Sequence, residues 1–435
     1  MVKKVPVVNV AEVETANLAG LPLEATVALA DLAGAVKEGL LGFCADVGLM
    51  VMAQMLETEM TARVGPKHAK IPGRQANWHG TAEGPVVLGG RLLSVTRPRG
   101  RSVEGTEIEL DAWHAFSSKD LLERLTVERM LAGVATRRHV DVAEPLGAEV
   151  EARSKATGRS SVSRRFKRAT EVALAELMAR DLSGLEVAVI MIDGLDVAGQ
   201  CVVVALVITT DGTKVPVGLW LGDTENKTVV TDLLADLVAR GLSVDGGLLA
   251  VLDGAKALAA GVKKVFGDKA QIQRCTLHKR RNIKGYLPKE LGSKIDWRLA
   301  RAFADADPAK GLDQAKRIAG ELKADHPDAT ASLLEGLEEM FTVRRLGVGG
   351  RLATTLTNTN CIESLISVAR TTTRNVKNWK DGSMKKRWVA AGMLEAERSF
   401  RRVRGCKEMP TLVDALRRQS TDEVVRPDNY DQAAA

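Results

Sequence analysis

Three acidic residues occupy positions that suit metal-dependent chemistry. Asp193 directly follows the apolar run Val187–Ile192 and Asp253 follows the run Gly247–Leu252, so each is expected at the C-terminal end of a buried strand. A carboxylate there costs desolvation free energy unless a positive charge meets it. If the strands are neighbours, both carboxylates face one crevice, and a divalent cation relieves their repulsion. Carboxylate oxygens with open coordination positions favour Mg²⁺, which keeps its waters and binds phosphates.

The third acid is Glu363, which opens the helix expected after Thr357. Each acid taken alone has a simpler interpretation. Asp-Gly is a common turn dipeptide, so Asp193 or Asp253 could be a turn residue, and Glu363, three residues after Asn360, could complete a capping box. The turn interpretation is preferred for Asp196, Asp211 and Asp223. A sequence with one acid after each of two predicted strands and a third at the start of a predicted helix is much rarer than a sequence with only one of these acids.

A second group of chemically useful residues surrounds Cys275. On the helix expected after this residue, His278, Arg281 and Asn282 are spaced to share one face, which could contact a scissile phosphate. Cys275 and His278 could also form half of a zinc site. A structural zinc needs four ligands, however, and the sequence has no second CxxC or HxxxH pair. The sequence therefore favours the phosphate-contacting role.

The elements that must position these residues form a mixed α/β pattern. Strands are expected at 187–192, 199–208, 215–221, 247–252 and 271–275, with Asp211-Gly212 as a hairpin turn. Helices are expected at 225–240 and 254–266, and residues 276–345 have an almost wholly helical pattern. Three meandering strands followed by two helix–strand units is the order of the ribonuclease H-like fold, a mixed sheet with helices on both faces. The helical stretch would be an all-α insertion at about 285–350.

The region before the sheet predicts a DNA-binding unit. Helices are expected at 119–131, at 136–144 and from Ser161 to about Arg180, with a basic loop before the last one. Two helices, a turn and a basic helix are typical of a helix-turn-helix module. A solvated basic helix face is the alternative. The DNA contacts expected at the start of this helix are Arg159, Arg164, Arg165, Lys167 and Arg168.

Charge is distributed unevenly along the 435 residues, although the net charge is only +7. Basic residues concentrate in windows at 153–168, 274–289, 364–388 and 398–407, and a surface of this kind attracts a polyanion at specific places. Further phosphate contacts are expected from Lys279, Arg280, Arg370, Arg374 and Lys377, the last three on the helix that carries Glu363. Aromatic residues make up only 3%, which argues against general base-stacking platforms.

The cysteine content, the N-terminal sequence and the hydropathy suggest the cellular compartment, and the order of the expected elements suggests the domains. Five cysteines without a CxxC, no signal-peptide pattern and no apolar run long enough for a bilayer predict a cytoplasmic, nucleoid-associated protein without a membrane segment. No Gly-x-x-x-x-Gly-Lys-[Ser/Thr] motif is present, so no nucleotide cofactor is expected. The expected domains are a helical and small β region at 1–115 (helices at 25–41 and 44–60), the helix-turn-helix region at 116–182, the core at 183–400 and a basic, then polar, tail at 401–435.

Together these motifs resemble the mutator-type transposases of bacterial insertion sequences. The resemblance rests on Asp193-Gly, Asp253-Gly-Ala, the block Gln273-Arg-Cys-x-x-His-Lys-x-Arg-Asn and Thr357-Asn-x-Asn-x-Ile-Glu-Ser. It covers about residues 120–400. A helical insertion fills the 110 residues between Asp253 and Glu363, as in that family. The N-terminal 115 or so residues match only loosely.

The resemblance implies a DDE transposase with a ribonuclease H-like core. Asp193, Asp253 and Glu363 would bind two Mg²⁺ ions, for which Mn²⁺ could substitute, and Cys275 and His278 match the family signature. Double-stranded DNA, as terminal inverted repeats and target, would be the partner, and pairing two DNA ends favours a homodimer. Trp297, in the insertion, would be either a core residue or a stacking partner for a displaced base. The alternatives are a ribonuclease H-like nuclease or junction resolvase, and a non-catalytic helix-turn-helix regulator.

Overall fold

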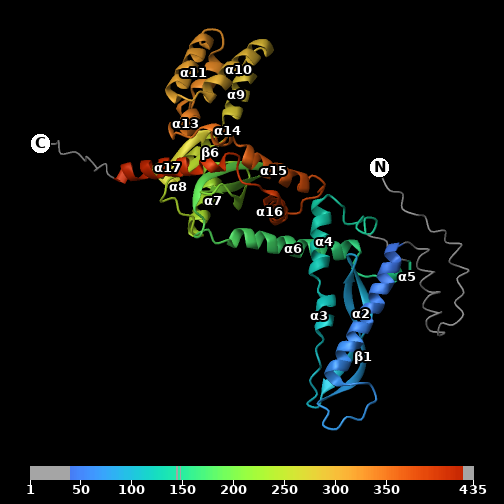
Figure 1. Ribbon diagram of the computed structural model, residues 1–435. Coiled ribbons are helices and arrows are strands. Elements are labelled where there is room, and N and C mark those ends of the chain that lie inside the picture. Colours follow the sequence, from blue (N-terminus) through green and yellow to red (C-terminus); the bar gives the residue numbers. More distant parts are fainter. Residues whose placement is uncertain (1–39, 144–145, 147, 425–435) are drawn as a thin grey trace, which may run out of the picture. The chain divides into compact units, whose positions relative to one another are not determined.

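The computed structural model describes residues 40–143, 146 and 148–424 (Figure 1). Most of the helix expected over 25–41 lies outside these residues. The chain divides into two compact units, one comprising 1–129 with 134–166 and the other 130–133 with 167–435. The domain boundaries expected from the sequence stay predictions. Within the described residues, no helix is long and apolar enough to cross a membrane.

The first unit is built around a long helix and a β-hairpin. Helix α2 (Leu40–Val64) packs on the antiparallel pair β1 (Ala76–Leu88) and β2 (Arg91–Ser102) through buried residues that include Leu56, Met60 and Leu93. Two glycines with positive φ, Gly89 and Gly90, form the tight connection between the strands, a conformation that glycine adopts without a Cβ penalty. The unit also contains α3 (Asp111–Ser117), α4 (Asp120–Leu131), α5 (Ala148–Arg153) and the start of α6 (Arg159–Ala179).

Two of the three helices expected in the helix-turn-helix region are present, and the DNA-binding role of this region stays a prediction. Helices α4 and α6 lie close to the expected ranges. The helix expected at 136–144 is wrong, because its described residues, 136–143, form turns and bends. His139 is buried in this segment, and its Nε2 has no hydrogen-bond partner within the described residues. The spacing of the apolar and Arg side chains therefore does not produce a helix in this segment, where the buried side chain is the polar His139.

The second unit contains a five-stranded mixed sheet in the order β5-β4-β3-β6-β7. Its elements follow the expected order: β3 (Val187–Val197), β4 (Gln200–Thr209), β5 (Lys214–Gly222), α7 (Lys227–Ala239), β6 (Leu248–Leu252), α8 (Lys256–Phe266) and β7 (Ala270–Arg274). Strand β4 pairs antiparallel with β3 and β5, whereas β3, β6 and β7 run parallel. The Asp211-Gly212 turn between β4 and β5 is confirmed, and Asp211 accepts hydrogen bonds from Thr213.

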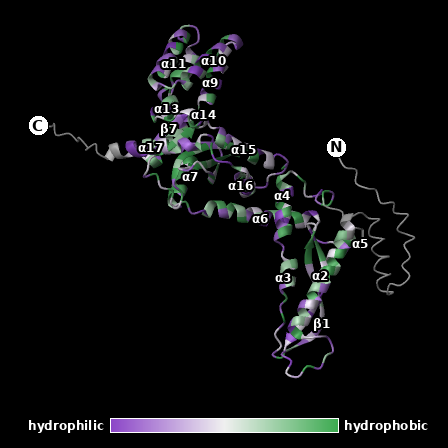
Figure 2. Cartoon of the chain, viewed as in Figure 1, coloured by the Kyte–Doolittle hydropathy of each residue, from purple (hydrophilic) through white to green (hydrophobic). Residues whose placement is uncertain are grey.

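Helices cover both faces of this sheet. Alternate residues of β3 point to opposite faces, so Val189 and Met191 pack with α15 (Asn360–Thr373), α16 (Gly382–Ser399) and α17 (Met409–Val424). Ile190 and Ile192 pack on the other face, with α7 and α8. The strands are almost uniformly hydrophobic, as Figure 2 shows for the green sheet layer, because both faces are buried.

Two expectations about the ends of elements are corrected. Strand β3 does not end at Ile192 but continues to Val197, because its antiparallel partner β4 is equally long. The expected C-terminal tail contains α17, and Leu412 and Leu416 of this helix are buried in the core of the sheet layer. The apolar spacing of α17 therefore outweighs the basic and polar composition of the segment.

The expected all-α insertion lies between β7 and α15. It contains α9 (Thr276–Gly285), α10 (Lys289–Ala304), α11 (Pro308–Leu322), α12 (Pro327–Leu334), α13 (Thr342–Arg345) and α14 (Gly350–Leu356). Helices α9 to α12 have a hydrophobic core of their own, which includes Leu299, Ile318 and Phe341. In Figure 2, α10 and α11 carry hydrophobic and hydrophilic residues along their length, as expected for helices with one buried face.

Candidate active site

Asp193 lies inside β3 and not in a turn. It pairs with Val204 of β4, so the turn interpretation of this residue is wrong. The parallel pairing of β3 with β6 ends at Met191 and Val251, two residues before Asp193 and Asp253. Both acids therefore follow the last parallel pair and lie at the same, C-terminal, end of two neighbouring strands.

Local hydrogen bonds orient the two aspartates. Oδ1 of Asp193 accepts a hydrogen bond from the amide of Gly194 at 2.8 Å, and Oδ1 of Asp253 accepts one from the amide of Ala255 at 2.8 Å. Asp253 thus forms the turn that its sequence context suggested, with Gly254 at φ +112°. Within the described residues, Oδ2 of neither aspartate has a hydrogen-bond partner, so the turn does not exclude a second role.

Glu363 lies in the first turn of α15, and Oε1 accepts a hydrogen bond from the Thr359 hydroxyl at 2.9 Å. Helix α15 begins at Asn360 with Thr359 as its N-cap, and the Thr359 side chain accepts no capping hydrogen bond from the helix; the amide of Asn360 donates to Asn358 instead. The capping-box interpretation of Glu363 is therefore wrong. The carboxylate is free to face the aspartates, since α15 covers the side of β3 to which the odd-numbered residues point.

Thr359 links Glu363 to the Cys275–His278 pair. Its hydroxyl oxygen lies 3.4 Å from Cys275 Sγ and 3.3 Å from His278 Nδ1. His278 Nδ1 is also 3.8 Å from Glu363 Oε1. A threonine hydroxyl carries one hydrogen, so it donates to one of these groups at a time and can accept from His278 Nδ1–H. The signature residues thus belong to the side of the site that carries Glu363.

Charge crowding changes the proton affinities of the site. Burial, and after it the charge of Asp253, raises the pKa of Asp193 to about 6. The hydrogen bond to Cys275 raises the pKa of His278 above its usual value, against the effect of burial, and the charges of Glu363 and Asp253 add to the rise. Burial alone would raise the pKa of the Cys275 thiol, but its hydrogen bonds with His278 and Thr359 leave it below the usual value. The surroundings of Asp193 and His278 are therefore net negative.

The structure adds an acid that the sequence interpretation missed. Glu225 lies between β5 and α7, and burial, followed by the charges of Asp253 and Asp193, raises its pKa to about 7. No apolar strand precedes Glu225 directly, and it stands in a polar loop beside Asn226, the N-cap of α7. The only sequence signal would have been an acid at the start of the helix that follows the third strand.

The donor set suits a hard divalent cation. The carboxylates of Asp193, Asp253 and Glu363 supply the oxygen ligands that Mg²⁺ prefers, and a cation would offset the repulsion that raises the pKa of Asp193. Within the part of the chain that the structure describes, no three His, Cys, Asp or Glu side chains are close enough to hold a metal ion as they stand. The chemistry of the donors fits, and coordination would require the side chains to close in.

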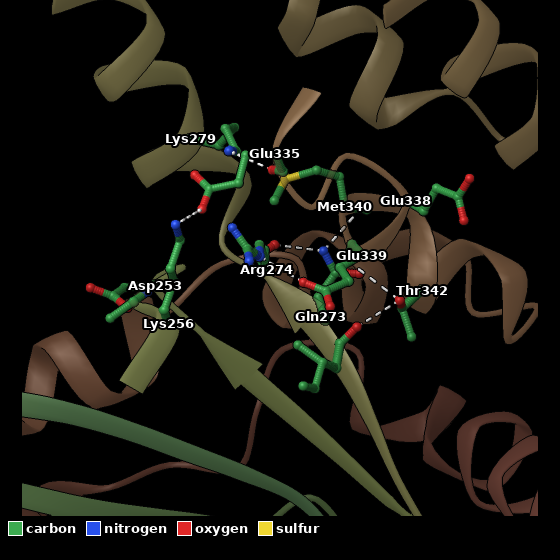
Figure 3. A network of polar contacts seen from close by, with 12 residues as sticks. Asp253, Lys256, Gln273, Arg274, Lys279, Glu335, Glu338, Glu339, Met340 and Thr342 are labelled. Atoms are coloured by element: carbon green, nitrogen blue, oxygen red, sulfur yellow. Dashed lines mark hydrogen bonds and ion pairs between the residues drawn. The ribbon is translucent and has the colours of Figure 1, made fainter. Parts of the chain in front are cut away.

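The last two residues of β7, Gln273 and Arg274, anchor the insertion (Figure 3). Gln273 is fully buried; its Nε2 donates to the Met340 carbonyl at 3.0 Å, and its Oε1 accepts from the Val343 amide at 2.9 Å. Arg274 donates to Glu339 at 2.6 Å. These contacts join the last strand of the sheet to the end of the helical insertion, so Gln273 and Arg274 have structural roles.

Lys279 and Arg280 were expected to contact phosphate, but the structure places both side chains against the insertion. Lys279 is buried, and its Nζ donates to the Ser332 and Glu335 carbonyls at 2.6 and 2.8 Å. Arg280 forms two hydrogen bonds with Asp296 at 2.8 and 2.9 Å. Their positive charges are thus committed to internal partners.

The other expected DNA contacts differ in exposure. Arg165 is partly buried and its Nε donates to the Thr126 hydroxyl. Helix α15 ends at Thr373, so Arg374 is its C-cap and Lys377 lies beyond it. The expectation that these two residues share this helix with Glu363 is wrong. The remaining predicted residues are exposed: Arg159, Arg164, Lys167, Arg168, Arg281, Asn282, Arg370 and Arg374.

Trp297 is 59% exposed on α10, so the core interpretation of this residue is wrong. Its ring stacks under the Arg301 guanidinium, 4.9 Å from the ring centroid. A groove of about 450 Å³ lies beside it, lined also by Arg298 and Arg317. Arg298 is paired with Glu321, which lines the same groove, so the exposed indole with Arg301 and Arg317 forms the surface on which a nucleobase could stack.

Comparisons with known proteins agree with the motifs. The model of the Mutator family of transposases matches residues 24–402. The chain is 28% identical over 205 residues to the transposase for insertion sequence element IS6120 of Mycolicibacterium smegmatis, a match that covers 46% of this chain and 62% of that protein. It is 32% identical over 181 residues to the transposase for element IST2 of Acidithiobacillus ferrooxidans, with coverage of 41% and 59%. The chain thus spans about 60% of the length of these relatives.

Proposed function

The chain belongs to the Mutator family of transposases, and on that premise we propose that it binds the terminal inverted repeats of an insertion sequence and catalyses DNA cleavage and strand transfer. The observation that carries the proposal is the convergence of Asp193, Asp253 and Glu363 from two neighbouring strands and the helix packed on them. The chain would act as a DDE transposase.

We assign the catalytic core to the ribonuclease H-like class. The support is topological: three antiparallel strands are followed by two parallel ones in the order β5-β4-β3-β6-β7, with α7 and α8 on one face and α15 on the other. This arrangement places Asp193 on the central strand and Asp253 after its parallel neighbour. The helical insertion separates Glu363 from the aspartates in the sequence but not in space.

Two Mg²⁺ ions, or Mn²⁺ in their place, would be held by Asp193, Asp253 and Glu363. When bound, such ions supply positive charge at the phosphate and activate the attacking oxygen of an in-line displacement. The chain's own groups orient the reaction. The amide of Gly194 and the turn at Ala255 hold the aspartate oxygens in place, and Thr359 holds Glu363. The raised pKa of His278 favours its protonated form beside the acids, where it can donate to a phosphate oxygen.

Double-stranded DNA would bind through the exposed cations on either side of the acids. Arg281 on α9 and Arg370 on α15 are exposed and belong to the two helices that carry His278 and Glu363. The exposed start of α6 would hold the terminal repeat, with Arg159 and Arg164 toward phosphates and base edges. Pairing the two ends of one element would use two copies of the chain.

The test is a strand-cleavage and strand-joining assay with Mg²⁺ on a DNA fragment that carries the element's own end. Asp193→Asn, Asp253→Asn and Glu363→Gln each remove one charge with little change of shape. We expect each to reduce both steps by at least about 100-fold, because the same group serves both. Asp223→Asn is the matched control, since Asp223 is exposed and outside the site.

The outcomes separate the functions. Wild-type activity in any of the three variants would remove that residue from the site. Metal-dependent cutting without any joining would favour a nuclease or resolvase, and repeat binding without cutting would favour a regulator. Gel-shift titration of Arg159→Ala and Arg164→Ala tests the repeat contacts separately. The dependence of wild-type affinity on salt should be steep, because several phosphates are neutralised.

A further inference from the structure

Glu225 approaches the site from the opposite side of the sheet to Glu363. The side chain of Asp193 belongs to the face of β3 covered by α15, whereas Gly194, the next residue, belongs to the face covered by α7 and α8. Glu225 lies immediately before α7, two residues ahead of its first residue, Lys227. Acids therefore reach the end of β3 from both layers of helices.

The absence of a side chain at residue 194 is what admits Glu225. A Cβ atom on Gly194 would lie 2.8 Å from Oε2 of Glu225 and 3.0 Å from Sγ of Cys201. Real Cβ atoms almost never approach other atoms so closely. The φ angle of Gly194 is not positive, so its backbone conformation does not require glycine. The carboxylate end of Glu225 therefore occupies space that a side chain at residue 194, next to Asp193 in the sequence, would fill, and a Cβ there would displace it.

Glu225 has no cation to balance it. Within the described residues it forms no ion pair and no hydrogen bond, although it is partly buried. The neighbouring thiol of Cys201 supplies no positive charge, and burial, followed by the charge of Glu225, raises its pKa to about 11. The charges that act on Glu225 are those of Asp253 and Asp193, both negative. A carboxylate in such surroundings is costly in the free protein.

We propose that Glu225 is a fourth carboxylate of the metal-binding site, reaching Asp193 and Asp253 through the gap left by Gly194. This inference rests on the proposed function, because it adds a ligand to the ions that Asp193, Asp253 and Glu363 would hold. A role in metal binding explains why a carboxylate without an ion-pair partner among the described residues lies beside Gly194. Glu225 would bind an ion either directly or through one of its waters, and would limit the positions that the ion can take between the two aspartates.

The test measures Mn²⁺ binding to the full chain without DNA, by electron paramagnetic resonance of the free ion, together with thermal unfolding with and without the ion. Glu225→Gln removes the charge and keeps the shape. We expect Mn²⁺ to bind about 10- to 100-fold more weakly to this variant, the range typical when a residue supporting a metal site is lost. Without metal the variant should unfold at a higher temperature than the wild type, since one of three crowded negative charges is gone.

If Glu225 is a metal ligand, Glu225→Gln should bind Mn²⁺ more weakly and yet unfold at a higher temperature without metal. A structural residue would lower the unfolding temperature in both conditions. Gly194→Ala is the second variant: its methyl group would displace Oε2, so it should also weaken Mn²⁺ binding while all four acids remain. Asp223→Asn is the matched control, because Asp223 stands on the same segment but is exposed.

Two results would overturn the inference. Glu225→Gln with wild-type Mn²⁺ affinity, measured alongside an Asp193→Asn variant that has lost binding, would exclude Glu225 and leave the proposed function intact. No Mn²⁺ binding by the wild-type chain would count against both the inference and the metal-dependent part of the proposed function.

Discussion

Replacing Gln273 by leucine should loosen the joint between the sheet and the helical insertion. Gln273 is completely buried at the end of β7. Its amide bridges two main-chain groups of the insertion, the Met340 carbonyl at 3.0 Å and the Val343 amide at 2.9 Å. Leucine has a similar volume, so the change leaves little cavity. It removes the only side-chain partner that the structure records for each of these two groups.

The magnitude follows from the two groups left without partners. An unsatisfied buried donor or acceptor costs about 1–3 kcal/mol, so two of them cost about 2–6 kcal/mol. The apolar leucine side chain recovers part of this through burial, and a net loss of about 2–4 kcal/mol is expected. The free energy of unfolding of a typical domain is about 5–15 kcal/mol, so the loss is large.

Urea unfolding and amide hydrogen exchange measure the effect. With a urea m-value of about 1–3 kcal/mol per molar, the midpoint should fall by about 0.7–4 M. The Val343 amide should exchange at least about 30-fold faster, since about 2 kcal/mol corresponds to that factor. Gln271→Leu is the matched control, because Gln271 lies two residues earlier on the same strand, is partly exposed and makes only a 3.4 Å contact with the Asp268 carbonyl.

A Gln273→Leu midpoint equal to that of Gln271→Leu would refute the reasoning. It would mean that the main-chain groups of the insertion find other partners, and that Gln273 does not hold the insertion to the sheet. If the midpoint falls but the Val343 amide exchanges at the wild-type rate, the loss would lie elsewhere in the fold, and the bridge to Val343 would carry none of it.

Three further predictions concern single side chains. Burial lowers the pKa of Lys279 to about 8. Between about pH 8 and the unfolded value near 10.5, the unfolded chain therefore binds more protons than the folded chain, and the free energy of unfolding should rise with pH. Lys279→Met should flatten that rise in urea midpoints measured across this window. The hydrogen bond from Arg99 lowers the pKa of Glu107 to about 2, so Glu107→Gln should destabilise the first unit near pH 7. The difference in stability from wild type should vanish as the pH falls from about 4.5 to 2. An equal difference in stability at pH 7 and at pH 2 would contradict this prediction. Trp297→Ala should weaken DNA binding by about 5- to 150-fold with an unchanged unfolding temperature, because stacking on one base contributes about 1–3 kcal/mol, and a gel-shift titration showing wild-type affinity would remove Trp297 from the DNA surface.

The sequence alone was sufficient for the main organisation of the second unit. Uninterrupted apolar runs rich in β-branched residues, such as Val202–Ile208, predict strands buried on both faces, and their alternation with helical periods gave the element order. Asp193, Asp253 and Glu363 were found because each stands at the predicted boundary of such an element, although β3 continues past Asp193 to Val197. The Mutator family could be identified for the same reason, since its motifs are short, local and tied to those boundaries.

Local pattern misjudged residues whose role depends on distant partners. Lys279 and Arg280 belong to a basic block, and their spacing suggested a phosphate surface. In the structure Lys279 donates to the main-chain carbonyl of Glu335, 56 residues away, and Arg280 pairs with the carboxylate of Asp296, 16 residues away. Charge in a sequence window does not reveal whether a carbonyl or a carboxylate of another element already binds it.

Only the tertiary structure decided the make-up of the site beyond these three acids. Glu225 is separated from Asp193 by two strands, and no spacing in the sequence links them; the link is Gly194, which leaves room for a carboxylate from the opposite layer. Packing likewise set the exposure of Trp297, because a helical period does not say which side of a helix a distant element will cover. The sequence determined the order of the elements in the second unit, and the packing of the layers determined which of their side chains meet.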